Sequence, residues 1–162
     1  MKAARFVKHG SPKEALEITT VPTPAPRAGQ VLVRVIATAI NNSDWSPVRG
    51  KPYLYRPLFD WLLPKVEIPG MELAGIMQSV ASGVTTFTAG GTVFGDISEH
   101  GFGTLAKYVS VDANALLKKP VGLSFEEARE IPHALGLAAQ GLQDLGKLTR
   151  ERKSESMAES EE

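Results

Sequence analysis

Cysteine is absent from the 162-residue chain. Its absence excludes a disulfide framework, a thiolate nucleophile and any zinc or iron–sulfur site that depends on Cys ligands. An excess of charge of either sign is also missing, because 18 Lys and Arg residues balance 18 Asp and Glu residues. A protein that binds nucleic acid through bulk positive charge would not have this balance, so we predict no nucleic-acid partner.

Long apolar runs are missing as well. No stretch approaches the roughly 20 apolar residues of a membrane-spanning helix, and the N-terminus MKAARFVKHG lacks the apolar segment of a signal peptide. We therefore predict a cytoplasmic protein with no membrane partner. Histidine is scarce, at positions 9, 100 and 133, without the i+3 or i+4 spacing of a local metal motif. His133 follows Pro132, and we interpret it as a hydrogen-bonded structural residue.

Glycine and proline are plentiful, with 15 and 11 residues spread along the chain. Such punctuation indicates many short elements joined by turns and favours β structure. The run QVLVRVIATAI at 30–40 is the clearest strand, since β-branched residues dominate it. Gly75 is expected at a bulge or a close backbone approach. We expect at least six strands, at 2–8, 15–21, 30–40, 71–80, 92–97 and 104–111.

Helices are expected in three places. A short one at 43–49 would be capped by Ser43 or Asn42. A second begins at Ser124, where Ser124-Phe125-Glu126-Glu127 forms a capping box. Pro132 then suits the first turn of a third helix at 132–145, with an apolar stripe. After it, the polar segment RERKSESMAESEE predicts disorder. The predicted domains are therefore 1–147 and a disordered tail at 148–162.

Three short features suggest chemistry but lack the structural context that this chemistry needs. Residues 101–106, GFGTLA, match G-x-G-x-x-A, but a dinucleotide site needs a helix opening at the glycines. A strand-like run follows instead, so we interpret the match as a glycine loop between strands. Ser43 and Asp44 are adjacent and would not face one another on a helix. Glu67 and Glu72 could form an acid–base pair, but no spacing brings them together.

Longer segments, taken in order, resemble the N-terminal, GroES-like domain of the medium-chain dehydrogenase/reductase superfamily, in its zinc-free quinone oxidoreductase and enoyl-reductase branches. The segment NNSDW with Arg49-Gly50 is similar to the family's N-P-S-D-W…R-G turn. Residues 69–95 and the stretch GFGTLAKYVSVDANALLKKPVGLSFEEAREIP are similar to further family patterns. The resemblance covers Met1 to about Lys147. It implies a mostly β (α+β) fold, a partly open GroES-like barrel with two C-terminal helices.

The resemblance also implies a chemistry. In the zinc-dependent branch a Cys ligand occupies the position of Asn41 and a His ligand that of Met71. A neutral amide and a thioether are poor replacements, so we expect no metal site. The family reduces quinones, enones, or carbonyls of the aldehyde type with NADPH. Asn41 would contact the nicotinamide or substrate, and Trp45, Tyr53 and Tyr55 would wall the substrate pocket; ordinary packing of these residues is the alternative. The resemblance identifies no catalytic residue.

In relatives the pattern continues into a nucleotide-binding domain, whereas residues 149–162 here are polar. We therefore expect an oxidoreductase-family domain, acting on a small-molecule substrate in intact relatives, that does not bind NADPH or catalyse alone. Two alternatives stay open: a stand-alone binding or interaction module, and a non-functional truncated gene product. We expect the chain to be monomeric or to associate non-specifically.

Overall fold

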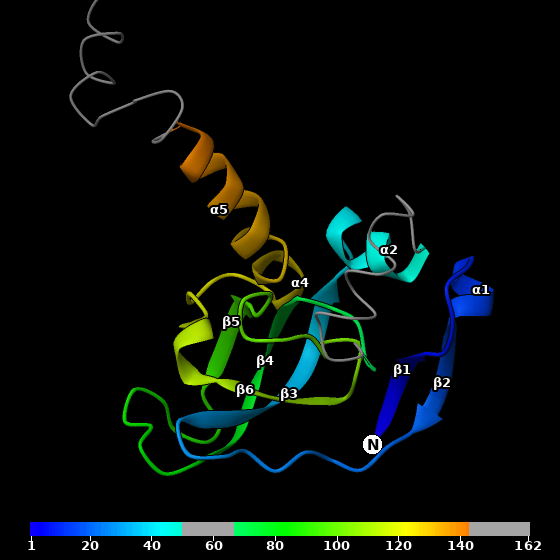
Figure 1. Ribbon diagram of the computed structural model, residues 1–162. Coiled ribbons are helices and arrows are strands. Elements are labelled where there is room, and N and C mark those ends of the chain that lie inside the picture. The colour runs from blue at the N-terminus through cyan, green and yellow to red at the C-terminus, as the bar shows by residue number, and fades with distance from the viewer. Residues whose placement is uncertain (50–66, 143–162) are drawn as a thin grey trace, which may run out of the picture.

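A computed structural model describes residues 1–49 and 67–142 of the chain. Two antiparallel sheets dominate it (Figure 1). The smaller sheet pairs β1 (Lys2–Phe6) with β2 (Leu16–Thr20). The larger sheet has the order β6-β3-β4-β5-β7. Its strands are β3 (Gln30–Ala39), β4 (Glu72–Val80), β5 (Thr92–Asp96), β6 (Tyr108–Asp112) and β7 (Leu117–Lys118).

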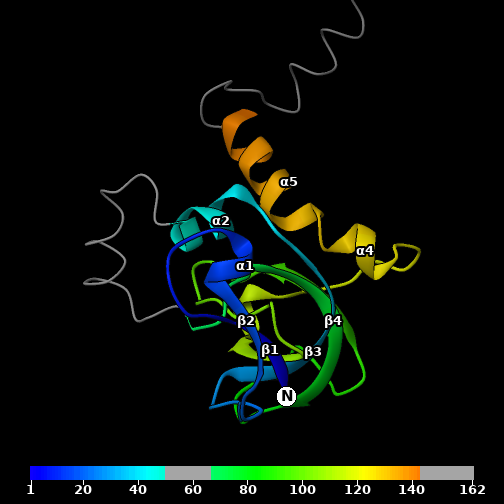
Figure 2. The ribbon, with the colours of Figure 1, turned by 90° about the vertical axis from the view of Figure 1, so that its right-hand side faces the viewer.

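The helices are short and lie mainly at one end of the larger sheet (Figures 1 and 2). They are α1 (Pro12–Ala15), α2 (Asn42–Arg49), the 3-10 helix η1 (Ala113–Ala115), α4 (Phe125–Ala128) and α5 (Ile131–Gln140). The capping box predicted at Ser124 is present, since the Glu127 amide donates to the Ser124 hydroxyl and the Ser124 amide to the Glu127 carboxylate. In the described part of the chain, no helix is long and apolar enough to cross a membrane.

The two sheets are joined through the segment that precedes β6. Ala3 and Ala106 form an isolated bridge, and the Ala4 amide donates to the Leu105 carbonyl at 2.8 Å. Within the described residues, β2 and β7 each pair with one strand, so the sheets do not form a closed barrel. The mostly β, partly open GroES-like fold expected from the sequence is confirmed.

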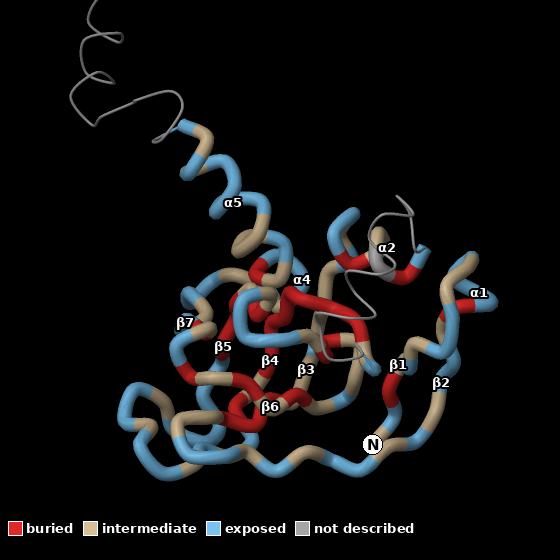
Figure 3. Tube along the Cα trace, viewed as in Figure 1, coloured by how far each residue is buried: buried red, intermediate tan, exposed pale blue. Residues whose placement is uncertain are grey.

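The core lies inside the larger sheet, where the buried residues cluster (Figure 3). It consists of alternate side chains from the paired strands, among them Val31, Val33, Leu73, Met77, Val93, Val109 and Val111. Gly75 faces Val35 where the β3–β4 register shifts, and an added Cβ there would lie 2.4 Å from the Arg34 carbonyl oxygen. The close approach predicted at Gly75 is thus confirmed.

Some boundaries differ from the predicted ones. The strand expected at 104–111 begins only at Tyr108, because the preceding residues bond across to Lys2, Ala4 and the Pro69–Gly70 turn. Two short elements were not predicted: α1, which carries a local capping box of Ser11 and Glu14, and β7, which depends on its pairing with β5. No residue of α5 is buried, so its apolar stripe faces outward, with Leu135 61% exposed and Leu137 58% exposed. The predicted tail at 148–162 lies outside the described residues.

Candidate functional site

A buried carboxylate organises the end of the larger sheet that carries the helices. Glu72 is the first residue of β4 and only 1% exposed. One carboxylate oxygen, Oε2, accepts a hydrogen bond from the Asn41 side-chain amide; the other, Oε1, accepts one from the His133 backbone amide at 2.8 Å. A buried charge is costly unless donors surround it, and these two donors supply that compensation. Glu72 therefore links the start of α2 to the start of α5.

Strand register brings these residues together. Glu72 lies opposite Ala39 of β3 on one side and opposite Asp96 of β5 on the other. Residues directly opposite each other in neighbouring strands project from the same face of a sheet. Asn41 follows β3 by two residues, so its side chain reaches the same carboxylate. We call Asn41, Asp44, Glu72, Asp96 and His133 the Glu72 cluster.

Asp96 and His133 form the second contact of the cluster. His133 Nδ1 lies 2.8 Å from Asp96 Oδ2, while the Ser98 amide donates to Asp96 Oδ1 at 2.8 Å. Burial acts to raise the pKa of Asp96, but the hydrogen bonds from Ser98 and His133 outweigh it, and the pKa lies below its usual value. Asp96 is therefore ionised and accepts the hydrogen bond from the ring N–H. This contact confirms the prediction that His133 is hydrogen-bonded.

Asp44 is the third carboxylate of the cluster and is 4% exposed. Its Oδ2 accepts from the Asn41 backbone amide at 2.8 Å, whereas its buried Oδ1 has no hydrogen-bond partner in the described part of the chain. Burial raises the pKa of Asp44, and the neighbouring charges of Glu72 and Asp96 raise it further. The predicted cap of α2 by Ser43 or Asn42 was wrong: α2 begins at Asn42, and Asp44 bonds back to the preceding residue, Asn41.

The predicted site residues fall in different places. Asn41 belongs to the Glu72 cluster. Trp45 lies in α2, half-buried, with the Arg49 guanidinium 5.4 Å from the centre of its ring. Tyr53 and Tyr55 lie outside the described residues. Their roles at a substrate pocket stay predictions.

The chemistry of the two family zinc positions does not suit zinc. Asn41 directs its amide N–H₂ towards Glu72, so this group acts as a hydrogen-bond donor. Met71 is 4% exposed and offers only a thioether. Among residues 1–49 and 67–142, no three His, Cys, Asp or Glu side chains are grouped to hold a metal ion. We therefore derive no metal chemistry from the cluster.

The glycine motif likewise does not suit the pyrophosphate of NADPH. Gly101 and Gly103 have φ values of 126° and 132°, and the chain then runs through Thr104 into β6 without opening a helix. The interpretation as a glycine loop between strands is confirmed. Thr104 is instead a structural link, since its hydroxyl lies 2.8 Å from that of Thr38, which donates to the Glu72 carbonyl.

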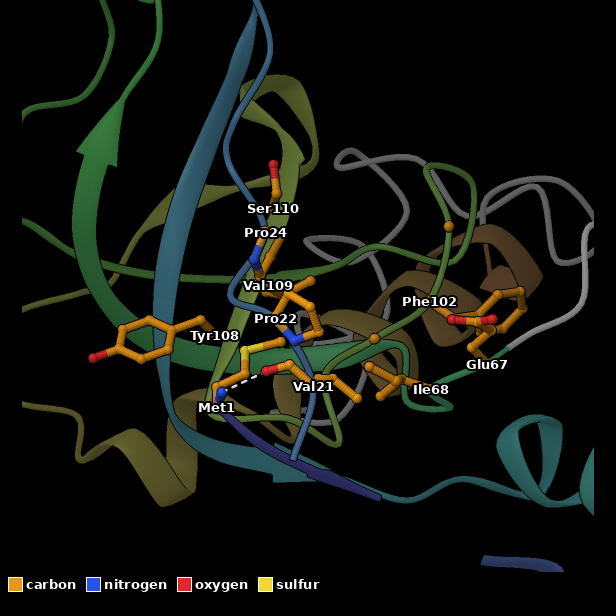
Figure 4. Close-up of a pocket in the computed structure, with 12 residues that line it drawn as sticks. Met1, Val21, Pro22, Pro24, Glu67, Ile68, Phe102, Tyr108, Val109 and Ser110 are labelled. Atoms are coloured by element: carbon orange, nitrogen blue, oxygen red, sulfur yellow. Dashed lines mark hydrogen bonds between the residues drawn. The ribbon is translucent and has the colours of Figure 1, made fainter. Parts of the chain in front are cut away.

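A separate pocket of about 530 Å³ lies beside this glycine loop (Figure 4). The proline segment, the glycine loop and β6 line it mainly with apolar groups, including Val21, Pro22, Ile68, Phe102 and Val109. It shares no residue with the Glu72 cluster. We call it the apolar pocket.

Most of the cluster was not predictable as a site. Asp96 had no local signal at all, and Glu72 is 31 residues from Asn41 and 61 from His133 along the chain. Only the pairing of β4 with both neighbours brings them together. A useful signal is a charged residue at the start of an apolar run, as with Glu72 before residues 73–77.

Comparison with known proteins shows what the chain is similar to. The pattern of the alcohol dehydrogenase GroES-like domain matches residues 27–121. The chain is 34% identical over 152 residues to 2-methylene-furan-3-one reductase of Solanum lycopersicum, covering 90% of the chain and 38% of that protein. It is 31% identical over 148 residues to the chloroplastic NADPH-dependent alkenal/one oxidoreductase of Arabidopsis thaliana, covering 88% and 37%.

The fold is matched in the solved structures as well. The quinone oxidoreductase from Coxiella burnetii superposes with a TM-score of 0.77 at 29% identity, covering 89% of this chain and 44% of that one. The chain thus spans about two fifths of the length of the relatives that it matches.

Proposed function

The chain belongs to the alcohol dehydrogenase GroES-like domain family, and we propose that it forms the substrate-binding part of a reductase that uses NADPH to reduce quinones or activated carbon–carbon double bonds. The observation that supports this most is the Glu72 cluster, which fixes Asn41 and His133 on the two oxygens of one carboxylate. The names of the chain's relatives describe an NADPH-dependent alkenal/one oxidoreductase and a quinone oxidoreductase.

The residues of this chain would hold and orient the acceptor. Asn41 is half-buried, and one N–H of its side-chain amide donates to Glu72, which leaves the second N–H as a donor for a carbonyl oxygen of the acceptor. Trp45 offers an aromatic wall one helical turn further on. When bound, NADPH supplies a hydride to the acceptor.

We further propose that the 162-residue polypeptide does not retain NADPH by itself. Hydride transfer needs the two reactants held within about 3–3.5 Å, and a dinucleotide is normally held by its pyrophosphate at the N-terminus of a helix. The loop at 101–106 offers no such helix. A cytoplasmic location remains a prediction. Independence of zinc also remains a prediction, based on Asn41 and Met71 being poor zinc ligands.

Two titrations of the full chain test this proposal. Tetramethyl-benzoquinone should move the NMR resonance of the Trp45 indole N–H, which a Trp45→Phe variant assigns. A Tyr108→Phe variant, altered at the apolar pocket, should bind the quinone as well as the wild type does. NADPH should give no saturable change in nicotinamide fluorescence. Failure of the quinone to move Trp45 would contradict the proposed substrate role, and saturable NADPH binding would contradict the proposed dependence on a further nucleotide site.

An interaction module is the second candidate, because one observation favours it. Residues 131–142 contain no Asp, Glu, Lys or Arg, and no residue of α5 is buried. A helix that is apolar on most sides is normally covered by another surface. Self-association of the full chain, measured by sedimentation, together with no quinone binding would favour this candidate over the reductase.

A further inference from the structure

His133 is held at two points that together fix its ring. Its backbone amide donates to Glu72, and its Nδ1 bonds to Asp96, both at 2.8 Å. The amide is one of the N-terminal amides of α5, which have no partner within the helix. Both the main chain and the ring plane of His133 are therefore set by carboxylates on the sheet.

The contact with Asp96 also determines which ring nitrogen can exchange a proton. Because the lowered pKa of Asp96 keeps it ionised, Nδ1 carries the hydrogen of that bond. The other nitrogen, Nε2, has no hydrogen-bond partner among the described residues, and the side chain is 26% exposed. A carboxylate behind one imidazole nitrogen orients the ring for proton exchange at the other.

The surroundings of His133 contain charges of known position. They come from Asp96 on β5, Glu72 on β4, Asp44 on α2, and the ion pair of Arg129 with Glu130 at 3.1 Å before α5. Glu72 and Asp96 are both occupied by hydrogen bonds, so neither competes for Nε2. A structural role alone needs only the contacts at the amide and Nδ1.

We propose that His133 exchanges a proton at Nε2 with the oxygen of a phenol- or hydroquinone-type ligand, and that Asp96 is its positioning residue. In the step, the O–H bond of the ligand breaks and an Nε2–H bond forms. The electron pair stays on the phenolate oxygen, and no electron is transferred. The reverse step returns the proton to that oxygen. This inference rests on the proposed function, because a hydroquinone is the reduced form of a quinone.

The test uses 4-nitrophenol, whose visible absorption band appears when its hydroxyl ionises. At a pH where the free dye is mostly protonated, the wild-type chain should bind it and strengthen that band. His133→Gln should weaken binding about tenfold, equivalent to about 1.4 kcal/mol, and lose the band. Asp96→Asn should bind but give a weaker band. His100→Gln, altered at an exposed histidine outside the cluster, should match the wild type.

The outcomes separate this inference from the proposed function. An unchanged band and affinity in His133→Gln would overturn the role of His133 while leaving quinone binding intact. If the quinone moves Trp45 but 4-nitrophenol binds without ionising, only the proton exchange fails. If neither ligand binds the wild type, the substrate role fails together with it. The far-ultraviolet circular dichroism of each variant checks that it is folded.

Discussion

Strand β4 passes through two regions that are stabilised in opposite ways. Leu73 and Met77 face the apolar core, where burial itself is favourable and each side chain packs against several others. Glu72, at the start of the same strand, enters a polar cluster where burial is costly and two specific donors offset the cost. The core therefore depends on volume and pattern, whereas the cluster depends on individual hydrogen bonds.

The largest effect should come from emptying the core. Met77 is 1% exposed, so Met77→Ala should lower the free energy of unfolding by about 2–5 kcal/mol through lost burial and a cavity. Ile18→Ala, at a residue 72% exposed, is the matched control and should change it by less than about 0.5 kcal/mol. Urea unfolding measures both. Equal losses of unfolding free energy in the two variants would show that the core does not lie at Met77.

Changing the charge in the cluster should cost somewhat less. In Glu72→Gln one carboxylate oxygen becomes an N–H₂ group, which cannot accept, so either Asn41 or the His133 amide loses its acceptor. We expect a loss of about 1–3 kcal/mol in unfolding free energy. Glu17→Gln, at an exposed site on β2, should be nearly neutral. A Glu72→Gln variant as stable as the wild type would show that the hydrogen bonds from Asn41 and His133 to Glu72 do not stabilise the fold.

These two regions also differ in how far the sequence predicts them. The strand at 30–40 was predictable from β-branched residues, and β4 from its apolar run, because alternation and propensity are local properties. The cap at Ser124 was predictable for the same reason. The pairing of Glu72 with Asp96 depends on which strands become neighbours, and no local pattern encodes it.

Two of the corrected elements also depend on what lies beside them in the fold. The segment before β6 reads as strand, yet its amides bond to the smaller sheet and to Gly70. The α5 stripe reads as a buried face, yet the described residues leave it exposed. Of the site residues proposed from the family resemblance, Asn41 lies in the cluster because its position follows β3 directly.

A smaller effect should follow from cutting the link between the cluster and the glycine loop. Thr104 is 1% exposed and its hydroxyl contacts that of Thr38. Thr104→Val keeps the shape and removes the hydroxyl, so unfolding free energy should fall by about 1 kcal/mol. Thermal unfolding followed by circular dichroism measures this change. No change would mean that the Thr38 bond to the Glu72 carbonyl is sufficient.

The smallest effect concerns pH. Because the pKa of Asp44 is raised in the folded state, the folded chain binds more protons than the unfolded chain between about pH 4 and that raised pKa. Stability from this group therefore falls as the pH rises through that window. Asp44→Asn should remove this fall, whereas Asp96→Asn should remove a loss of stability below about pH 4, since the pKa of Asp96 is lowered. Parallel pH profiles for all three proteins would contradict both assignments.

The proposed function places the substrate at the Glu72 cluster and not in the apolar pocket. Its most direct test is an NMR titration of the ¹⁵N-labelled full chain with tetramethyl-benzoquinone. We expect saturable shifts at Asn41, Trp45 and His133, with Val21, Phe102 and Tyr108 unmoved. Shifts confined to those three residues of the apolar pocket would contradict it.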